Sequence, residues 1–216
     1  MTQAKAGRGR IDKREAILDA AFTVFARRGY NQACVQEIAD EADVAKPTVY
    51  NHLTDKETLF REAVEAAADA VGAQCLDAIE RLRDPGADLP AALTDSARRL
   101  LRVCASEHAR ALRSLTYAQL AAFPDLVDSV QSRTSRRVAE ALGDRFARLM
   151  LAGRLRTTDP AGAAEQFLAL LTGPLESRSR LGARKVPAAE LRALADSAVD
   201  TFVRAYATPV GAPDLT

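Results

Sequence analysis

The chain contains no tryptophan, two histidines and three cysteines, and aromatic residues make up only 5% of its 216 residues. Three widely spaced cysteines form neither a disulfide framework nor the ligand spacing of a metal site. No apolar run approaches the roughly 18 residues of a membrane span, and the N-terminal MTQAKAGRGR lacks the apolar middle of a secretion signal. We therefore expect a cytoplasmic protein in a reducing compartment, with no membrane partner and no bound metal.

The sequence also lacks the motifs of common catalytic sites. It has no glycine-rich phosphate loop, no nucleophile elbow and no His-x-x-x-His or Cys-x-x-Cys spacing. The carboxylates of Glu37, Asp40 and Glu41 lie close together in the sequence, but this pattern is typical of a solvated helix face. We expect no enzyme and no cofactor. An all-α enzyme is an alternative that would require a buried, perturbed acid or base in a closed pocket.

The residues that are present predict helices throughout, because 48% of the chain is hydrophobic and no alternating β-branched stretch occurs. Proline and glycine clusters mark the breaks between the helices. Besides the two short helices within 35–56, we expect helices near Ile11–Arg28, Thr54–Asp84, Leu89–Glu107, His108–Phe123, Asp125–Ala152, Pro160–Leu181 and Pro187–Tyr206. Thr54 and Glu57 have the spacing of a capping box, which would open a long helix of about 28 residues, roughly 42 Å.

The stretch VQEIADEADVAKPTVYNHLTDK, residues 35–56, predicts a helix-turn-helix. Ile38 and Ala39 form the inward face of its first helix, and Val49 and Leu53 form that of the second. Pro47 suits the first turn of the second helix, where its missing N–H costs nothing. The remaining side chains of the second helix then point outward, and a short helix with such a face suits a DNA major groove. These side chains are Thr48, Tyr50, Asn51 and His52.

Several short motifs around this stretch fall in one register. They are Gly29-Tyr30, Val35-x-x-Ile38-Ala39, Ala42-x-Val44, Thr48-Val49-Tyr50-x-His52 and Lys56-Glu57-x-Leu59. On these residues, about the first quarter to third of the chain resembles the DNA-binding domain of TetR-type transcriptional regulators. Asp43 stands where glycine is usual in the turn, and Asp tolerates a left-handed conformation well. Ala45 and Cys34 replace Ser or Thr caps, and Ala45 should cost about 1 kcal/mol.

The resemblance implies an all-α fold in which a three-helix DNA-binding domain is joined by a long connecting helix to an all-α ligand-binding and dimerisation domain. We place the domains at 1–56 and 57–216. The expected partners are a double-stranded DNA operator and a small-molecule effector. The basic segment before and at the start of the first helix should reach phosphates, although residues before Arg8 can also be read as a solvated tail. The residues expected at DNA are Arg10, Gln36, Lys46, Thr48, Tyr50, Asn51, His52 and Lys56.

The second half resembles the AefR-like subgroup of the same family, in segments such as SLTYAQLAAFPDL and DPAGAAEQFLALLTG. The resemblance implies a homodimer through the last two long helices, although their apolar residues can instead face the chain's own core. It also implies release of DNA by a repressor when an effector binds. Because few charges fall on the inferred inner faces, we expect an apolar effector. The candidate lining residues are Cys104, Tyr117, Thr134 and Phe146.

Two further alternatives remain open. The second domain can serve dimerisation only, in a constitutive DNA binder with no cavity. The regulator can instead respond to oxidants through Cys34, which stands at the N-terminus of a helix, where thiolates are stabilised. In the simpler interpretation, Cys34 only replaces a capping Ser or Thr.

Overall fold

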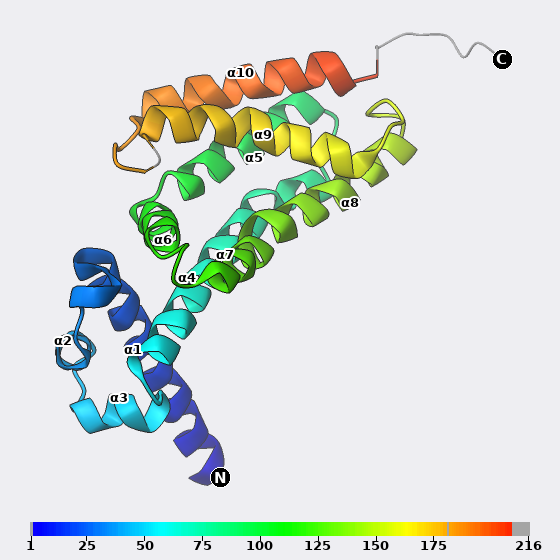
Figure 1. Ribbon diagram of the computed structural model, residues 1–216. Helices are drawn as coiled ribbons and strands as arrows, with labels where there is room; N and C mark the ends of the chain where they lie inside the picture. The colour runs from blue at the N-terminus through cyan, green and yellow to red at the C-terminus, as the bar shows by residue number, and fades with distance from the viewer. Residues whose placement is uncertain (1, 181, 209–216) are drawn as a thin grey trace. The chain divides into compact units, whose positions relative to one another are not determined.

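The computed structural model describes residues 2–180 and 182–208, with the side chains of residues 2–12 outside the description. The described residues form helices and one isolated β-bridge, between Leu155 and Ala207 (Figure 1). The all-α prediction is confirmed. The α-helices are α1 (Thr2–Gln32), α2 (Val35–Glu41), α3 (Lys46–His52), α4 (Lys56–Ala78), α5 (Leu89–Cys104), α6 (Glu107–Ala118), α7 (Pro124–Gln131), α8 (Arg137–Leu151), α9 (Pro160–Ser179) and α10 (Ala188–Tyr206).

The chain divides into two compact units, and each of them draws on separate stretches of sequence. The first unit contains the described residues up to Ala70 together with Ala111–Arg133. The second contains Val71–Arg110 and the described residues from Thr134 onward. Helices α4 and α6 therefore each contribute to both units. The boundaries of these compact units do not fall at residue 56. The functional division expected at residue 56 therefore stays a prediction.

The first unit is built around an aromatic cluster that joins three separate stretches of sequence. The ring of Phe60 in α4 lies 5.0 Å from Phe25, 4.9 Å from Tyr30 and 5.4 Å from Phe123. Phe25 and Phe60 are fully buried. Tyr30 therefore packs into the core, as its position after the first helix predicts. Phe123 brings the segment 111–133 into the same core.

The first helix differs from the prediction at its start. It begins at Thr2 instead of near Ile11, because Ala, Gln, Lys and Arg, the main residues of this segment, are good helix formers. Gly29 interrupts the helical dihedrals with φ 76° and ψ 165°, as expected of the glycine that ends the apolar stretch. Helical turns resume beyond it as far as Gln32.

The cap of α4 also differs from the prediction. The carboxylate of Asp55, and not the hydroxyl of Thr54, accepts the N–H of Thr58 at 2.7 Å. A carboxylate is a stronger acceptor than a hydroxyl at the positive end of a helix, and this hydrogen bond lowers the pKa of Asp55. The α-helix then ends at Ala78 instead of continuing to Asp84, and a 3₁₀ turn covers Glu80–Arg83.

The predicted single helix at 125–152 is interrupted by a π-helical turn at Ser132–Arg136, between α7 and α8. The hydroxyl of Ser132 donates to the carbonyl of Ser129 at 2.7 Å, a local bond that competes with the regular helical pattern. Arg133, inside the turn, pairs with Glu65 at 3.0 Å and with Asp69 at 2.6 Å. The wider turn thus fastens this segment to α4 within the first unit.

The second unit packs α8, α9 and α10 around fully buried Phe146, Phe167 and Phe202. Arg98 of α5 and Asp196 of α10 form a bidentate ion pair with both contacts at 3.0 Å. The apolar residues noted in α9 and α10 mostly face this core, whereas Leu168, Leu170 and Val203 are half-buried. Within the described residues, we find no helix both long and apolar enough to cross a membrane.

Candidate nucleic-acid interface

The helix-turn-helix is held by backbone bonds and by one side-chain cap. The sulfur of Cys34 accepts the N–H of Glu37 at 3.4 Å and so caps α2. Asp43 takes the left-handed conformation, with φ 52°, in the position where glycine is usual. The N–H of Val44 then bonds back to the carbonyl of Ala39 at 3.0 Å, which fixes the turn. Asp43 therefore supplies the geometry that the motif requires.

Helix α3 is anchored by its inward face. Val49 is 1% exposed and Leu53 is 3% exposed. Ala45 is the N-cap and has no side-chain cap bond, so the start of α3 depends on Pro47 and on the 2.8 Å bond from the N–H of Thr48 to the carbonyl of Ala45. A short helix with a poor cap is stabilised mainly by its packing.

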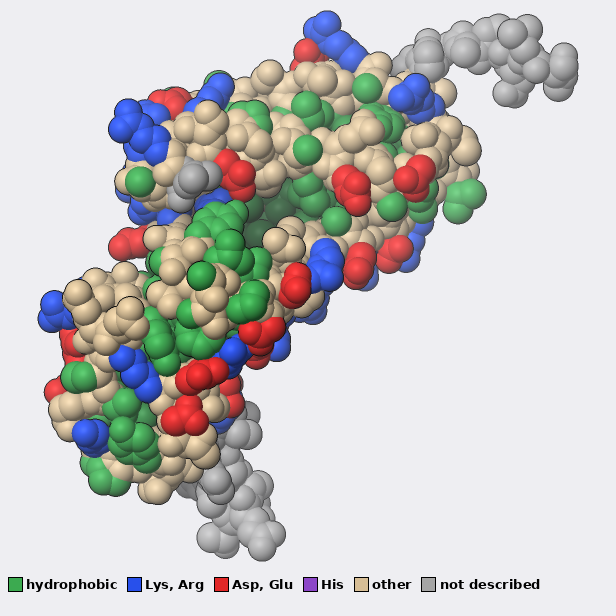
Figure 2. Space-filling view, in the orientation of Figure 1, with side chains coloured by type: hydrophobic (Ala, Val, Ile, Leu, Met, Phe, Trp, Pro, Cys, Tyr) green, Lys and Arg blue, Asp and Glu red, His purple; other side chains and the backbone are tan. Residues whose placement is uncertain are grey.

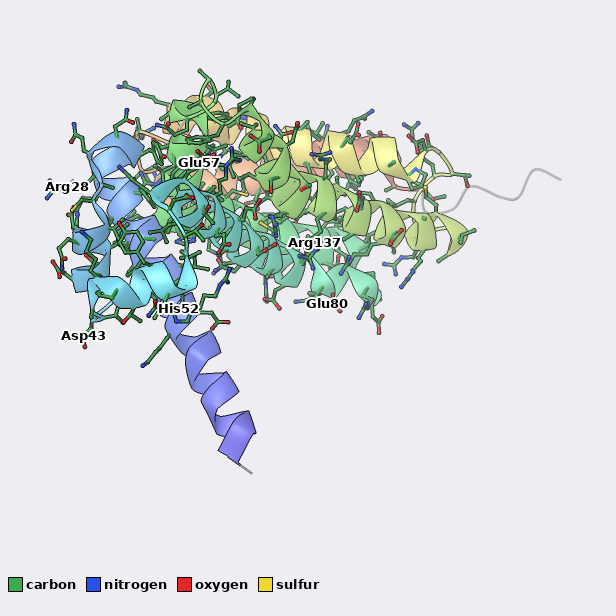
Figure 3. The ribbon with its side chains drawn as sticks, turned by 60° about the horizontal axis from the view of Figure 1, so that its bottom comes forward. Arg28, Asp43, His52, Glu57, Glu80 and Arg137 are labelled. Carbon is green, nitrogen blue, oxygen red and sulfur yellow. The ribbon has the colours of Figure 1, made fainter. Side chains whose placement is uncertain are left out.

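The outward face of α3 carries the side chains expected at the bases. Tyr50 is 45% exposed, which is unusual for a large aromatic side chain in this protein. Asn51 is exposed, and Thr48 and His52 are half-buried. Figure 3 shows Asp43 in the turn before α3 and His52 at the opposite end of the helix. Direct contact of these residues with DNA stays a prediction.

Gln36 and Lys56, two of the residues expected at DNA, have partners within the protein. The side-chain amide of Gln36 donates to Asp40 at 2.8 Å. The ammonium of Lys56 donates to the carbonyl of Asn31 at 3.1 Å and lies 5.0 Å from the centre of the Tyr30 ring. An ammonium has three N–H donors, so Lys56 can keep the Asn31 bond and still donate to a phosphate.

Lys46 and Arg10, the two remaining residues expected at DNA, differ in how much of them the structure describes. Lys46 is exposed as the first residue of α3. The side chain of Arg10 lies outside the described residues. The sequence did not predict the bond to Asn31, because a backbone carbonyl distant in the chain leaves no sequence signal. The bond between Gln36 and Asp40 could have been predicted, because the two residues are four apart on one helix.

The electrostatic character of α2 is set by its acidic residues. Glu37 accepts from Arg27 at 2.9 Å and from Arg28 at 3.1 Å, and Arg27 also reaches Glu41 at 3.4 Å. These hydrogen bonds from Arg27 and Arg28 lower the pKa of Glu37, and the pairing raises the pKa of Arg27. The arginines thus neutralise acidic charge on α2. No group of three or more potential metal ligands occurs among the described residues.

The four residues expected to line an effector pocket do not all belong to one compact unit. Cys104, Thr134 and Phe146 lie in the second unit, whereas Tyr117 lies in the first and is 51% exposed. Phe146 is fully buried, with its ring 5.1 Å from Phe202 and 5.8 Å from Phe167. Phe146 therefore forms part of the packed core. A lining role for the four stays a prediction.

Two family descriptions match the chain. Residues 17–63 match "Bacterial regulatory proteins, tetR family", and residues 91–208 match "AefR-like transcriptional repressor, C-terminal domain". The first match covers the helix-turn-helix described above. The second covers more than half of the chain, including α6–α10.

The chain is similar to a TetR-family transcriptional regulator from Mesorhizobium loti MAFF303099, whose crystal structure superimposes with a TM-score of 0.85. The two sequences are 31% identical, and the match covers 92% of this chain and 98% of that one. The transcriptional activator FasR of Mycolicibacterium smegmatis is 40% identical over 60 residues, 28% of this chain and 27% of FasR. The transcriptional repressor KstR2 of Rhodococcus jostii is 31% identical over 88 residues, 41% of this chain and 43% of KstR2. The matches to these two regulators thus span less than half of either relative.

Proposed function

Because the chain belongs to the TetR family of transcriptional regulators, with an AefR-like C-terminal domain, we propose that it is a cytoplasmic homodimeric repressor that leaves its operator when a small molecule binds. The observation that carries the proposal is the outward face of α3, where Tyr50 and Asn51 are exposed on a helix anchored by Val49 and Leu53. Surface aromatic and amide side chains on such a helix suit base and phosphate contacts in the major groove. In a dimer, the two recognition helices should lie about 34–36 Å apart.

We expect Tyr50→Ala to weaken operator binding by about ten- to a hundredfold, since a base-reading contact contributes about 1–3 kcal/mol. The operator would be selected from random duplexes by the wild-type protein, and affinities would be measured by gel-shift titration. Leu120→Ala is the matched control, because Leu120 is an apolar residue that is 50% exposed and lies outside the helix-turn-helix. Wild-type affinity in Tyr50→Ala would remove α3 from the interface.

Arg10 should act differently from Tyr50. A phosphate contact contributes affinity without sequence information. Arg10→Ala should therefore weaken binding to operator and to unrelated DNA by the same factor and lower the salt dependence of both. Loss of operator binding alone would instead assign Arg10 to base reading.

The proposed dimer uses the outer faces of α9 and α10. Every fourth residue along one exposed stripe of α10 is small, which would let a second helix approach closely. Half-buried Leu168 and Leu170 of α9 add apolar area, and Figure 2 shows hydrophobic side chains among scattered charged ones over these helices. Sedimentation velocity tests this directly, and a monomer at micromolar concentration would contradict the proposal. The stripe consists of Ala189, Ala193, Ser197, Thr201 and Ala205.

The proposed coupling between effector and DNA uses α4 and α6, the helices that contribute to both compact units. Within the first unit, Arg61 of α4 is bound by Asp125 at 2.6 Å and lies 4.8 Å from the Phe123 ring. Movement of the segment 111–133 would therefore move α4 and, with it, the core that supports α3. An effector shifts this equilibrium only if it prefers one of the two states.

We expect the effector to be apolar or aromatic, since the second unit buries aromatic rings and several of its arginines, such as Arg98 and Arg145, pair with carboxylates. A thermal-shift screen of a chemically diverse library would identify stabilising compounds. Each hit would then be added to the protein–DNA complex. Stabilisation by strongly anionic compounds alone would contradict the apolar pocket. Stabilising hits that leave operator affinity unchanged would favour the constitutive alternative.

A further inference from the structure

Two cysteines that are far apart in the sequence meet inside the second unit. Cys75 lies in the last turns of α4, and Cys104 is the last residue of α5. Their thiols are in hydrogen-bonding contact. Cys75 is 5% exposed, whereas Cys104 is half-buried. The pair therefore has one sulfur in the core and one close to solvent.

Local structure explains this difference in exposure. Helix α5 ends at Cys104, and the N–H of the C-cap Ala105 bonds back to Leu101 and Val103. Leu100 and Leu101 face the core, so the helix end carries Cys104 to the edge of the packed region. Cys75 lies on the buried face of α4 with Val71 and Ala78.

The contact and the burial of Cys75 also change the pKa of its thiol. The hydrogen bond to Cys104, together with burial, raises the pKa of the Cys75 thiol far above its usual range. Burial thus disfavours loss of the Cys75 proton, and half-buried Cys104 is the sulfur that an oxidant from solvent can reach. Oxidation of thiols follows exposure and thiolate character, and a second thiol in contact resolves the oxidised form.

We propose that Cys75 and Cys104 form a reversible intramolecular disulfide when the protein meets hydrogen peroxide. The sulfur of Cys104 attacks one peroxide oxygen, the O–O bond breaks, and water leaves, giving the Cys104 sulfenic acid. The sulfur of Cys75 then attacks the sulfur of Cys104, its proton passes to the departing hydroxyl, and a second water leaves. Two thiols are oxidised to one disulfide while one peroxide is reduced to two waters. A dithiol reductant reverses the reaction.

Cys34 does not belong to this pair. It lies in the first unit, where its sulfur caps α2. The three cysteines thus separate into one oxidisable pair and one single capping thiol. The pair would cross-link the end of α4 to the end of α5, a restraint within the second unit that needs no DNA and no effector.

The test uses the full-length protein, a small excess of hydrogen peroxide, and alkylation of remaining thiols before digestion with trypsin under non-reducing conditions. The three cysteines fall in separate peptides, 29–56, 62–81 and 103–110. We expect peptides 62–81 and 103–110 to appear joined, with the loss of two hydrogens, in wild type and in the matched control Cys34→Ser. Dithiothreitol should separate them.

Cys104→Ser should abolish the cross-link, and its half-buried position makes the change tolerable for folding. Cys75→Ala should stop the reaction at the Cys104 sulfenic acid, which dimedone traps. The oxidised wild type should also melt at a higher temperature than the reduced protein, because a cross-link restricts the unfolded chain. The proposal is overturned if peptides 62–81 and 103–110 stay alkylated while Cys34 is oxidised, or if the only disulfide joins two chains. None of these readouts depends on operator binding.

Discussion

The two compact units bury their aromatic rings in different ways. In the first unit, Phe60 and Phe123 pack with Tyr30, a half-buried ring that lies under the ammonium of Lys56. In the second, Phe146, Phe167 and Phe202 are all fully buried. Tyr206 stacks on Phe202 at 4.6 Å, and the guanidinium of Arg156 lies 5.0 Å from the centre of the Tyr206 ring.

This difference separates two tasks. The closed cluster of the second unit holds α8, α9 and α10 together, and the outer faces of α9 and α10 are the ones we propose for dimerisation. The open cluster of the first unit includes Phe123, which comes from far along the chain, and it ends at Lys56, a residue we expect at DNA. A change in the first cluster should therefore affect DNA binding, whereas a change in the second should affect stability and assembly.

The largest effect should come from truncating one fully buried ring in each cluster. Phe60→Ala and Phe202→Ala should each lower the free energy of unfolding by about 3–5 kcal/mol, because each removes a large side chain and leaves a cavity. Denaturant titration followed by circular dichroism measures both, and Leu151→Ala, at a side chain 90% exposed, is the control. The change at Phe60 should also weaken operator binding, in proportion to the loss of folded first unit. The change at Phe202 should weaken dimerisation. If Phe60→Ala instead weakened dimerisation and Phe202→Ala weakened operator binding, the proposed division of tasks would be contradicted.

A smaller effect should come from repairing the cap of α3. Ala45→Ser would place a hydroxyl where it can accept an N–H in the first turn, which should stabilise the first unit by about 1 kcal/mol. The melting temperature measures this change. Ala105→Ser is the matched control in the second unit, because Ala105 is a C-cap, where such a hydroxyl meets no free N–H groups. Equal shifts in both variants would mean that capping is not the cause.

The smallest effect should appear in acid. The hydrogen bond from Arg61 lowers the pKa of Asp125, so the folded state binds fewer protons than the unfolded state at pH values near 4 and below. The contribution is complete above the ordinary aspartate pKa of about 3.9, and it is lost as the pH falls through the lowered value. Asp125→Asn should therefore flatten the acid side of the stability profile.

Denaturation midpoints between neutral pH and about pH 3 measure that slope. The control is Asp200→Asn, which removes an exposed carboxylate paired with Arg204 at 3.0 Å in the second unit. If Asp125→Asn leaves the acid slope unchanged, the Arg61 pair does not tie the segment 111–133 to α4 at this pH.

The sequence by itself determined the helices and the DNA-reading motif, because both depend on near neighbours. Helical periodicity, proline and glycine breaks, and the spacing from Ile38 to Leu53 are local patterns, and they predicted α2, α3 and the position of most other helices. Asp43 was correctly accepted in the turn because its tolerance of positive φ is a property of the residue itself. Local errors arose where two local signals competed, as at Thr54 and Asp55.

Only the tertiary structure determined which residues from distant parts of the chain are in contact. Phe123 joining Phe60, Lys56 bonding to Asn31, and Cys75 meeting Cys104 each pair residues from distant parts of the chain. A buried ring has the same appearance in sequence whether it fills a core or lines a pocket, so the packing of Phe146 against Phe167 and Phe202 could not be predicted from the sequence. Such contacts follow from how helix faces pack together, and packing depends on every facing side chain at once.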